Sequence, residues 1–160
     1  MSDPAAMTDL IRTVRADEMD IVRALFREYA AWLQVDLCFQ GFEQELAALP
    51  GAYAAPQGGI WFSEQSGQIA GCVALRPLDQ ERCEIKRLWV REAYRGRSLG
   101  RRLAETALRE GRAKGYKRAC LDTLGQMTEA RQLYKSLGFQ EIPAYYDNPL
   151  EEVLYLEREL

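Results

Sequence analysis

The chain has 160 residues, of which 48% are hydrophobic and 28% are charged, and its net charge is −3. These values predict one globular domain over residues 1–160, with a disordered tail over about residues 1–8. No window approaches the ~18 consecutive apolar residues of a membrane span, and the first residues lack a secretory signal. We therefore expect no membrane segment and a cytosolic location.

Two residue types narrow the chemistry. The cysteines Cys38, Cys72, Cys83 and Cys120 are widely spaced, with no Cys-x-x-Cys pair, so we expect them to be buried and reduced. Histidine is absent from the sequence, which argues against most zinc sites and against an imidazole base, and no metal is expected. Any acid–base step must use a carboxylate, a tyrosine, a thiol, a lysine or water.

Charge is distributed unevenly along the chain. Residues 84–118 contain twelve Lys or Arg against four Asp or Glu, a local charge of +8, while the remaining residues sum to −11. This asymmetry indicates an anionic ligand, and a solvated helix face is the alternative. A nucleic acid partner is not expected, because the acidic remainder would repel a long polyanion.

The hydrophobic pattern, taken in chain order, predicts an α+β domain with one central sheet. A strand at residues 11–15 is followed by a helix for which Asp17 can serve as the cap. The later expected elements are a helix at 42–49, a hairpin of strands at 59–62 and 68–75, a strand at 84–90, a helix at 99–114, a strand at 119–124, a helix at 128–137 capped by Thr128, and strands at 140–142 and 153–157.

Helical spacing predicts which side chains face the core. In the helix after Asp17, the expected core residues are Met19, Ile21, Val22, Leu25, Phe26, Tyr29 and Trp32. In the helix at 99–114, the expected buried stripe is Leu99, Leu103, Ala107 and Leu108. Its exposed side places Arg101, Glu105 and Arg109 as partners one turn apart. The strand at 84–90 is apolar enough to be covered on both faces.

The loop over residues 95–100 joins that strand to the helix at 99–114. A glycine-bearing turn at a helix start directs unpaired backbone N–H groups outward, at the positive end of the helix dipole, which suits phosphate. Gly96 and Gly100 permit close approach, and Arg95, Arg97, Arg101 and Arg102 add charge. An ordinary basic connection is the alternative. The patterns of P-loop and dinucleotide-binding proteins do not match.

Two stretches resemble the GNAT superfamily of N-acetyltransferases. The first is Leu88-Trp89-Val90 followed by Arg95-Gly96-Arg97-Ser98-Leu99-Gly100-Arg101, which resembles its acetyl-CoA signature. The second is residues 128–139, which resembles its A-x-x-L-Y-x-x-x-G-F helix. The resemblance implies a GNAT-like domain with a mixed, mostly antiparallel sheet flanked by helices, which uses acetyl-CoA as co-substrate. It also implies that the loop residues hold the pyrophosphate and that Leu88, Trp89 and Val90 bind the pantetheine arm.

Two positions depart from the family pattern. Ser98 stands where the family usually has glycine, and binding is expected to survive if the φ angle of Ser98 stays negative. Met127 stands where the family often has an asparagine that contacts the cofactor, so one polar contact is expected to be missing.

The resemblance implies that Tyr134 protonates the leaving thiolate, and a core tyrosine is the alternative. Without histidine, Glu84 is the first choice for the base, acting directly or through a water. Asp122 is the second choice.

The predicted function is direct transfer of an acetyl group from acetyl-CoA to a primary amine of a small molecule or a protein. The acceptor is not defined by the sequence. An aromatic set could line its pocket or simply close the core: Tyr29, Trp32, Tyr145 and Tyr146. The alternatives are a non-catalytic acetyl-CoA sensor or interaction module and, less favoured, an RNA-binding accessory protein. A homodimer is left open.

Overall fold

The computed structural model describes residues 9–34, 37, 41–150 and 152–160; the tail expected over residues 1–8 and Cys38 lie outside them. The strands are β1 (Leu10–Thr13), β2 (Gly59–Gln65), β3 (Gln68–Pro77), β4 (Arg82–Val90), β5 (Arg118–Leu124), β6 (Gln140–Ile142) and β7 (Val153–Glu159). The helices are α2 (Met19–Leu33), α3 (Phe42–Ala48), α4 (Leu99–Ala113) and α5 (Thr128–Ser136), with single 3-10 turns at Ala16–Glu18, Gly51–Tyr53 and Glu92–Tyr94.

The described strands form one seven-stranded sheet in the order β1-β2-β3-β4-β5-β7-β6. β4 and β5 run parallel, because α4 carries the chain from the end of one to the start of the other, and the other neighbouring pairs in the described part are antiparallel. The prediction of an α+β fold with a mixed, mostly antiparallel sheet is confirmed. The predicted hairpin is also present, with Ser66 and Gly67 both at positive φ, as a two-residue turn requires.

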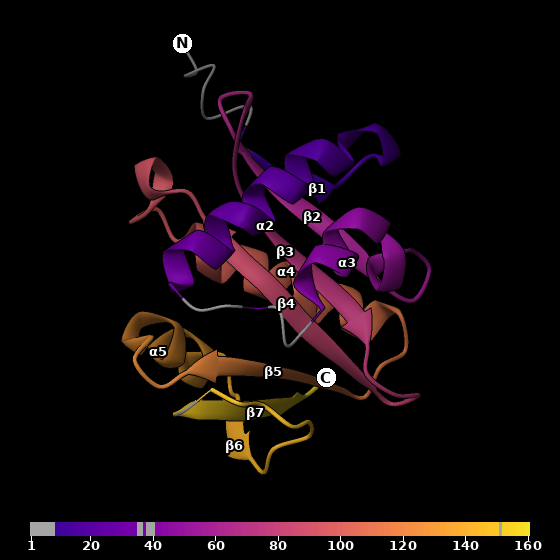
Figure 1. The fold of residues 1–160 in the computed structure, drawn as a ribbon, viewed down its shortest axis with the longest axis vertical. Coiled ribbons are helices and arrows are strands. Elements are labelled where there is room, and N and C mark those ends of the chain that lie inside the picture. Colours follow the sequence, from indigo (N-terminus) through magenta and orange to yellow (C-terminus); the bar gives the residue numbers. More distant parts are fainter. Residues whose placement is uncertain (1–8, 35–36, 38–40, 151) are drawn as a thin grey trace.

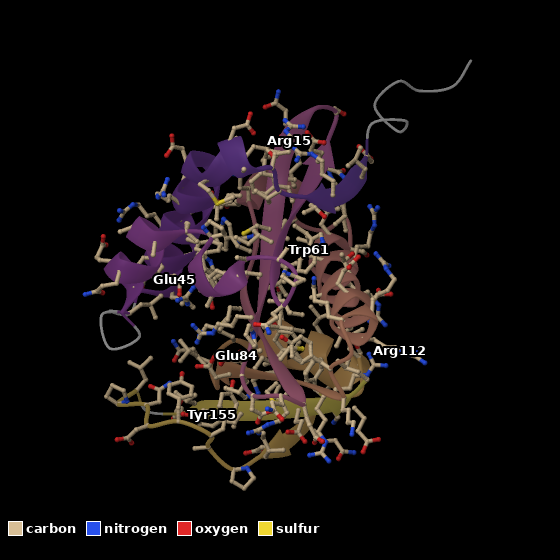
Figure 2. All side chains as sticks on the ribbon, turned by 90° about the vertical axis from the view of Figure 1, so that its right-hand side faces the viewer. Arg15, Glu45, Trp61, Glu84, Arg112 and Tyr155 are labelled. Atoms are coloured by element: carbon tan, nitrogen blue, oxygen red, sulfur yellow. The ribbon has the colours of Figure 1, made fainter. Side chains whose placement is uncertain are left out.

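Helices cover both faces of the sheet (Figures 1 and 2). α2 and α3 lie on one face, where Val22, Leu25 and Phe26 are fully buried, while α4 and α5 contribute to the core on the other face. The expected core positions Ile21 and Trp32 were wrong, since they are 37% and 47% exposed. Ile21 precedes Val22 by one residue and is therefore turned away from the sheet.

The helix α4 follows its prediction closely. Leu99, Leu103, Ala107 and Leu108 are buried, and Arg101 pairs with Glu105 at 3.2 Å between Nε and Oε1. The buried stripe faces the sheet, so the start of α4 is held next to the end of β4.

The predicted helix caps were wrong at both positions. A 3-10 turn that contains Asp17 precedes α2, so Glu18 occupies the N-cap position. Thr128 is already the first helical residue of α5, and Met127 precedes it as the cap without a side-chain hydrogen bond. The cysteines Cys72, Cys83 and Cys120 are free and buried, as expected.

A β-bulge in β4 changes which face its side chains reach. Arg87 has φ 59°, and the β3–β4 register shifts between the pairs Cys72–Trp89 and Ala74–Lys86. Ile85 packs in the core beneath α4, whereas Trp89, four residues on, packs in the core beneath α2 and α3. Strict alternation would have put both on the same face. β4 is therefore covered on both sides, as predicted.

β4 and β5 pair only over their first residues. Arg82, Cys83 and Glu84 align with residues 118–120, although both strands continue beyond this point. The parallel pair therefore opens in the middle of the sheet, close to where Figure 2 labels Glu84. The opening lies between α2 on one face of the sheet and α5 on the other. The candidate site is found there.

Candidate active site

A cavity of about 90 Å³ occupies the opening between β4 and β5. Its walls come from α2, β4, β5 and α5, so residues far apart in the sequence meet there. The lining residues are Tyr29, Leu33, Leu37, residues 85–88, residues 121–124, Met127, Ala130, Tyr134 and Leu150. Apolar side chains share the wall with charged and hydroxyl groups.

A larger groove of about 360 Å³ runs from this opening to the start of α4. Its lining residues are Trp32, residues 88–90, Tyr94, Arg95, Gly96, residues 98–101, Met127, Glu129, Ala130 and Leu133. Leu88, Met127 and Ala130 line both the groove and the cavity. The two spaces therefore meet at the bulged part of β4.

Every residue predicted to bind the cofactor lines this groove except Arg97, whose guanidinium instead lies over the Tyr94 ring at 5.6 Å. Within the described chain, neither Arg95 nor Arg97 forms an ion pair with a carboxylate. The loop therefore brings positive charge and a helix N-terminus to the end of a groove, an arrangement that suits phosphate.

The backbone of this loop is left-handed at two positions. Gly96 has φ 81°, and Ser98 has φ 60° and ψ 22° as the N-cap of α4. The condition of a negative φ at Ser98 is therefore not met, because the turn into α4 requires the conformation that glycine adopts at little cost. Ser98 still lines the groove, and its side chain makes no capping hydrogen bond.

Two tryptophans hold Arg95 at the groove. Its guanidinium carbon lies 4.9 Å from the centre of the Trp89 ring and 5.5 Å from that of Trp32, and its Nε donates to the carbonyl of Val90 at 3.1 Å. The carboxylate of Glu28 accepts from Trp89 Nε1 at 3.1 Å. Trp32, which the sequence suggested for an acceptor pocket, lies instead beside the predicted phosphate loop.

Tyr134 lies on the wall of the cavity and is 7% exposed. Its ring makes an edge contact with Phe139, with 5.6 Å between ring centres. Burial raises the pKa of its hydroxyl above the usual range, so the group stays protonated near neutral pH. The position of Tyr134 is compatible with both roles that the sequence left open, a core packing residue and the acid that protonates the thiolate.

Asp122 also lines the cavity, opposite Lys86. Their closest charged atoms, Oδ1 and Nζ, are 3.8 Å apart, and the side chains are 14% and 4% exposed. The hydroxyl of Tyr146 donates to Asp122 Oδ2, and Asn148 donates to that hydroxyl. Burial lowers the pKa of Lys86, and the carboxylates of Glu84 and Asp122 oppose this shift.

Glu84, the first choice for the base, is 1% exposed and is not part of either lining. One carboxylate oxygen accepts from Arg76 at 2.9 Å (Nε) and lies 2.8 Å from its Nη2, and the other accepts from the Tyr145 hydroxyl at 2.7 Å. Burial and the Glu84 charge raise the pKa of Tyr145. The structure thus places Glu84 one layer behind the cavity.

The sequence did not single out Lys86 or Arg87. Arg87 lines the cavity, and its Nε and Nη2 donate to Glu45 of α3 at 3.0 and 3.1 Å. The available signal was two adjacent cations inside an otherwise buried strand, which is unusual without a partner or a ligand.

In the described part of the chain, no cluster of three or more Cys, Asp or Glu side chains is placed to hold a metal ion. Over the same residues, no helix is long and apolar enough to cross a membrane.

Comparison with known proteins assigns the family. The model of the acetyltransferase (GNAT) family matches residues 21–139, most of the chain. The chain belongs to this family. An uncharacterized N-acetyltransferase of Schizosaccharomyces pombe is 36% identical over 145 residues, covering 89% of each chain. The uncharacterized N-acetyltransferase YjgM of Escherichia coli is 27% identical over 147 residues, covering 89% of this chain and 88% of the relative.

Solved structures share the fold of this acetyltransferase. A Streptococcus agalactiae acetyltransferase has a TM-score of 0.77 at 20% identity, over 96% of this chain and 99% of that one. The structure of yncA from Salmonella typhimurium, a putative acetyltransferase with its cofactor acetyl-CoA, has a TM-score of 0.71 at 18% identity, over 94% and 93% of the two chains.

The predicted family and fold class are therefore confirmed. The family and the relatives also support the predicted enzyme class, an acetyl-CoA-dependent N-acetyltransferase, over the non-catalytic sensor. They do not identify the acceptor or test the roles of individual residues.

Proposed function

We propose that this acetyltransferase passes the acetyl group of acetyl-CoA directly to a primary amine in the cavity between β4 and β5. The observation that carries the proposal is the continuity of two spaces through Leu88, Met127 and Ala130. One space ends at a cationic helix N-terminus, and the other holds Tyr134 and Asp122. Such a path suits a substrate with a phosphate at one end and a reactive group at the other.

The groove supplies the binding contacts for acetyl-CoA. Backbone N–H groups around Gly96 and Ser98, together with Arg95, would hold the pyrophosphate. Residues 88–90 would line the pantetheine arm, which brings the thioester toward the cavity. Fixing thioester and amine side by side can supply ~7–11 kcal/mol of the barrier. A backbone donor of β4 facing the developing oxyanion could contribute ~3–4 kcal/mol more.

The transfer needs one base and one acid. The acceptor ammonium loses a proton, its nitrogen attacks the thioester carbon, and the new C–N bond replaces the C–S bond as the thiolate leaves. Tyr134, protonated and at the cavity wall, donates a proton to the thiolate. A thiol with a pKa near ~8.5 leaves fairly easily, so this acid gives a moderate rather than an absolute advantage.

Asp122 is our preferred proton acceptor. Each carboxylate is held by one cation and one tyrosine, Asp122 by Lys86 and Tyr146 and Glu84 by Arg76 and Tyr145, but only Asp122 lines the cavity. A candidate base must lie within hydrogen-bond reach of the proton that it removes, directly or through one water. Glu84 could act as the base on this proposal only if the proton reached it from the cavity through the hydroxyl of Tyr145.

Thiol release from acetyl-CoA in the presence of a panel of amines, measured beside acetyl-CoA binding, tests the proposal. Binding with amine-dependent thiol release is expected. Binding without turnover on any amine would favour the sensor, and absence of binding would contradict both. Retention of acetyl-CoA binding in the presence of excess RNA is also expected, because the groove is built for a small phosphate ligand.

Two further predictions from the sequence belong with this proposal. They are a single acetyltransferase domain over residues 1–160 and a cytosolic location without nucleic acid or membrane partners. Whether the chain forms a homodimer is a third, open point. Sedimentation of the purified chain, with and without acetyl-CoA, measures the last of these directly.

A further inference from the structure

The cavity contains a lysine–carboxylate pair, whereas transfer to a simple alkyl amine calls for a base and an acid but for no cation beside the base. Three cation–carboxylate pairs of the described residues cluster here on the α2–α3 side of the sheet. Arg76 with Glu84 and Arg87 with Glu45 are joined by hydrogen bonds of 2.9–3.1 Å. The pair of Lys86 with Asp122 differs, since its closest charged atoms are 3.8 Å apart.

Position separates this pair from the other two. Among the described residues, Lys86 and Asp122 form the only one of the three pairs in which both partners line the cavity. Glu84, Arg76 and Glu45 do not line it. The Lys86–Asp122 pair therefore borders the cavity with both of its charges, and Tyr146 also donates to Asp122. Of the other two pairs, only Arg87 reaches the wall.

The two charges lie at a spacing that a particular class of amine matches. In an α-amino acid, a single carbon separates the ammonium nitrogen from the carboxylate carbon, so its opposite charges are close neighbours. Aligned head to tail with the protein pair, the ammonium faces Asp122 and the carboxylate faces Lys86. A simple alkylamine would satisfy Asp122 alone and would compete with Lys86 for it, and a buried charge that loses its partner is costly.

We propose that the acceptor is a small α-amino acid, bound with its ammonium at Asp122 and its carboxylate at Lys86. The inference rests on the proposed function and names the substrate class of the same site. Much of the remaining wall is apolar, which favours an aliphatic side chain, and the volume of about 90 Å³ favours a small one. The apolar residues involved are Leu33, Leu37, Leu124, Met127 and Leu150.

Three acceptors that share one side chain test the role of the carboxylate. Leucine carries it, leucinamide replaces it with a neutral amide as at the N-terminus of a peptide, and isoamylamine lacks it. The expected kcat/KM of the wild-type enzyme is at least about tenfold higher for leucine than for either analogue, the size of a charged hydrogen bond. The amine of leucinamide deprotonates more readily, so intrinsic reactivity works against this result.

A variant pair links the preference to Lys86. Lys86→Met is expected to bring the leucine-to-isoamylamine ratio of kcat/KM close to one. Lys117→Met makes the same change at an exposed lysine that pairs with Glu81, and it is expected to keep the wild-type ratio. The wild-type comparison stands by itself if Lys86→Met fails to fold.

The outcomes separate the two proposals. Equal kcat/KM for the three acceptors, or a preference for leucinamide, would overturn the amino-acid assignment while the acetyltransferase proposal stands. Failure of every amine in the wider panel to accelerate thiol release would overturn both.

Discussion

The groove beside α4 and the cavity between β4 and β5 meet end to end, yet they are built differently. The groove takes its predicted phosphate end from one short segment, residues 95–100, in which two left-handed residues shape the main chain. The cavity takes its walls from four elements, and its charged groups are side chains of β4 and β5.

This difference affects how each part responds to substitution. A site formed by main-chain N–H groups tolerates changes of side chain, provided that the backbone conformation is kept. A site formed by paired buried charges does not, because removing one partner leaves the other uncompensated. Substitutions in the cavity should therefore have larger effects than those in the groove.

The largest effect is expected for Asp122→Asn. Loss of a general base typically costs ~10²–10⁴-fold in rate, so kcat should fall within this range while acetyl-CoA binding is retained. Steady-state kinetics with direct binding measurements checks both quantities.

Glu84→Gln is the matched control, since it makes the same isosteric change one layer deeper. It should lower kcat less and lower the free energy of unfolding by about 1–3 kcal/mol, because Arg76 and Tyr145 lose a charged acceptor. A larger kcat loss for Glu84→Gln than for Asp122→Asn would assign the base to Glu84.

The next effect is expected for Tyr134→Phe, which keeps the ring against Phe139 and removes only the hydroxyl. Loss of the acid should reduce kcat by about 10²-fold, at the lower end for general acids because a thiolate leaves readily. An acetyl thioester of a more acidic thiol should shrink the defect. A defect of unchanged size would indicate that the hydroxyl serves another purpose.

The contrast between the two parts also explains what the sequence could reveal. The groove follows a contiguous pattern, so its residues were named from the loop 95–100 and the strand before it, and most line the same space in the structure. The fold could be predicted for a similar reason, since the alternation of apolar residues in strands and their helical spacing are local properties of the sequence. Only the helix caps and single exposed positions such as Ile21 were misassigned.

The cavity was harder to predict from the sequence because its ion pairs join segments that are far apart in the chain. Lys86 and Asp122 lie on strands that are separated in the sequence by the whole of α4, and no local sequence pattern predicts their contact. The bulge at Arg87 then reverses the alternation that would have assigned faces to the end of β4. Trp32, suggested for the acceptor pocket or for the core, lines the groove and contacts Arg95.

A smaller effect is expected in the loop for Ser98→Gly. Removing a left-handed residue other than glycine stabilises the folded state by ~1–2 kcal/mol. The greater freedom of glycine in the unfolded chain offsets ~0.5–1 kcal/mol of this gain. The free energy of unfolding should therefore rise by about 0.5–1 kcal/mol, with acetyl-CoA affinity retained. Ser98→Ala keeps the strain and should not stabilise. Weaker acetyl-CoA binding by Ser98→Ala would show that the hydroxyl is a ligand, against the main-chain model.

The smallest effect is expected for Trp32→Ala. Exposed cation–π contacts contribute ~0.5–1 kcal/mol, so releasing Arg95 from one of its two rings should raise the Kd for acetyl-CoA about 2–5-fold. Because Arg95 would act on the pyrophosphate, the KM for S-acetylpantetheine, which lacks it, should not change. Ile21→Ala, at another exposed apolar position of α2, is the control and should leave both values unchanged. An equal rise for both thioesters would place Trp32 against the pantetheine arm rather than behind the phosphate-binding arginine.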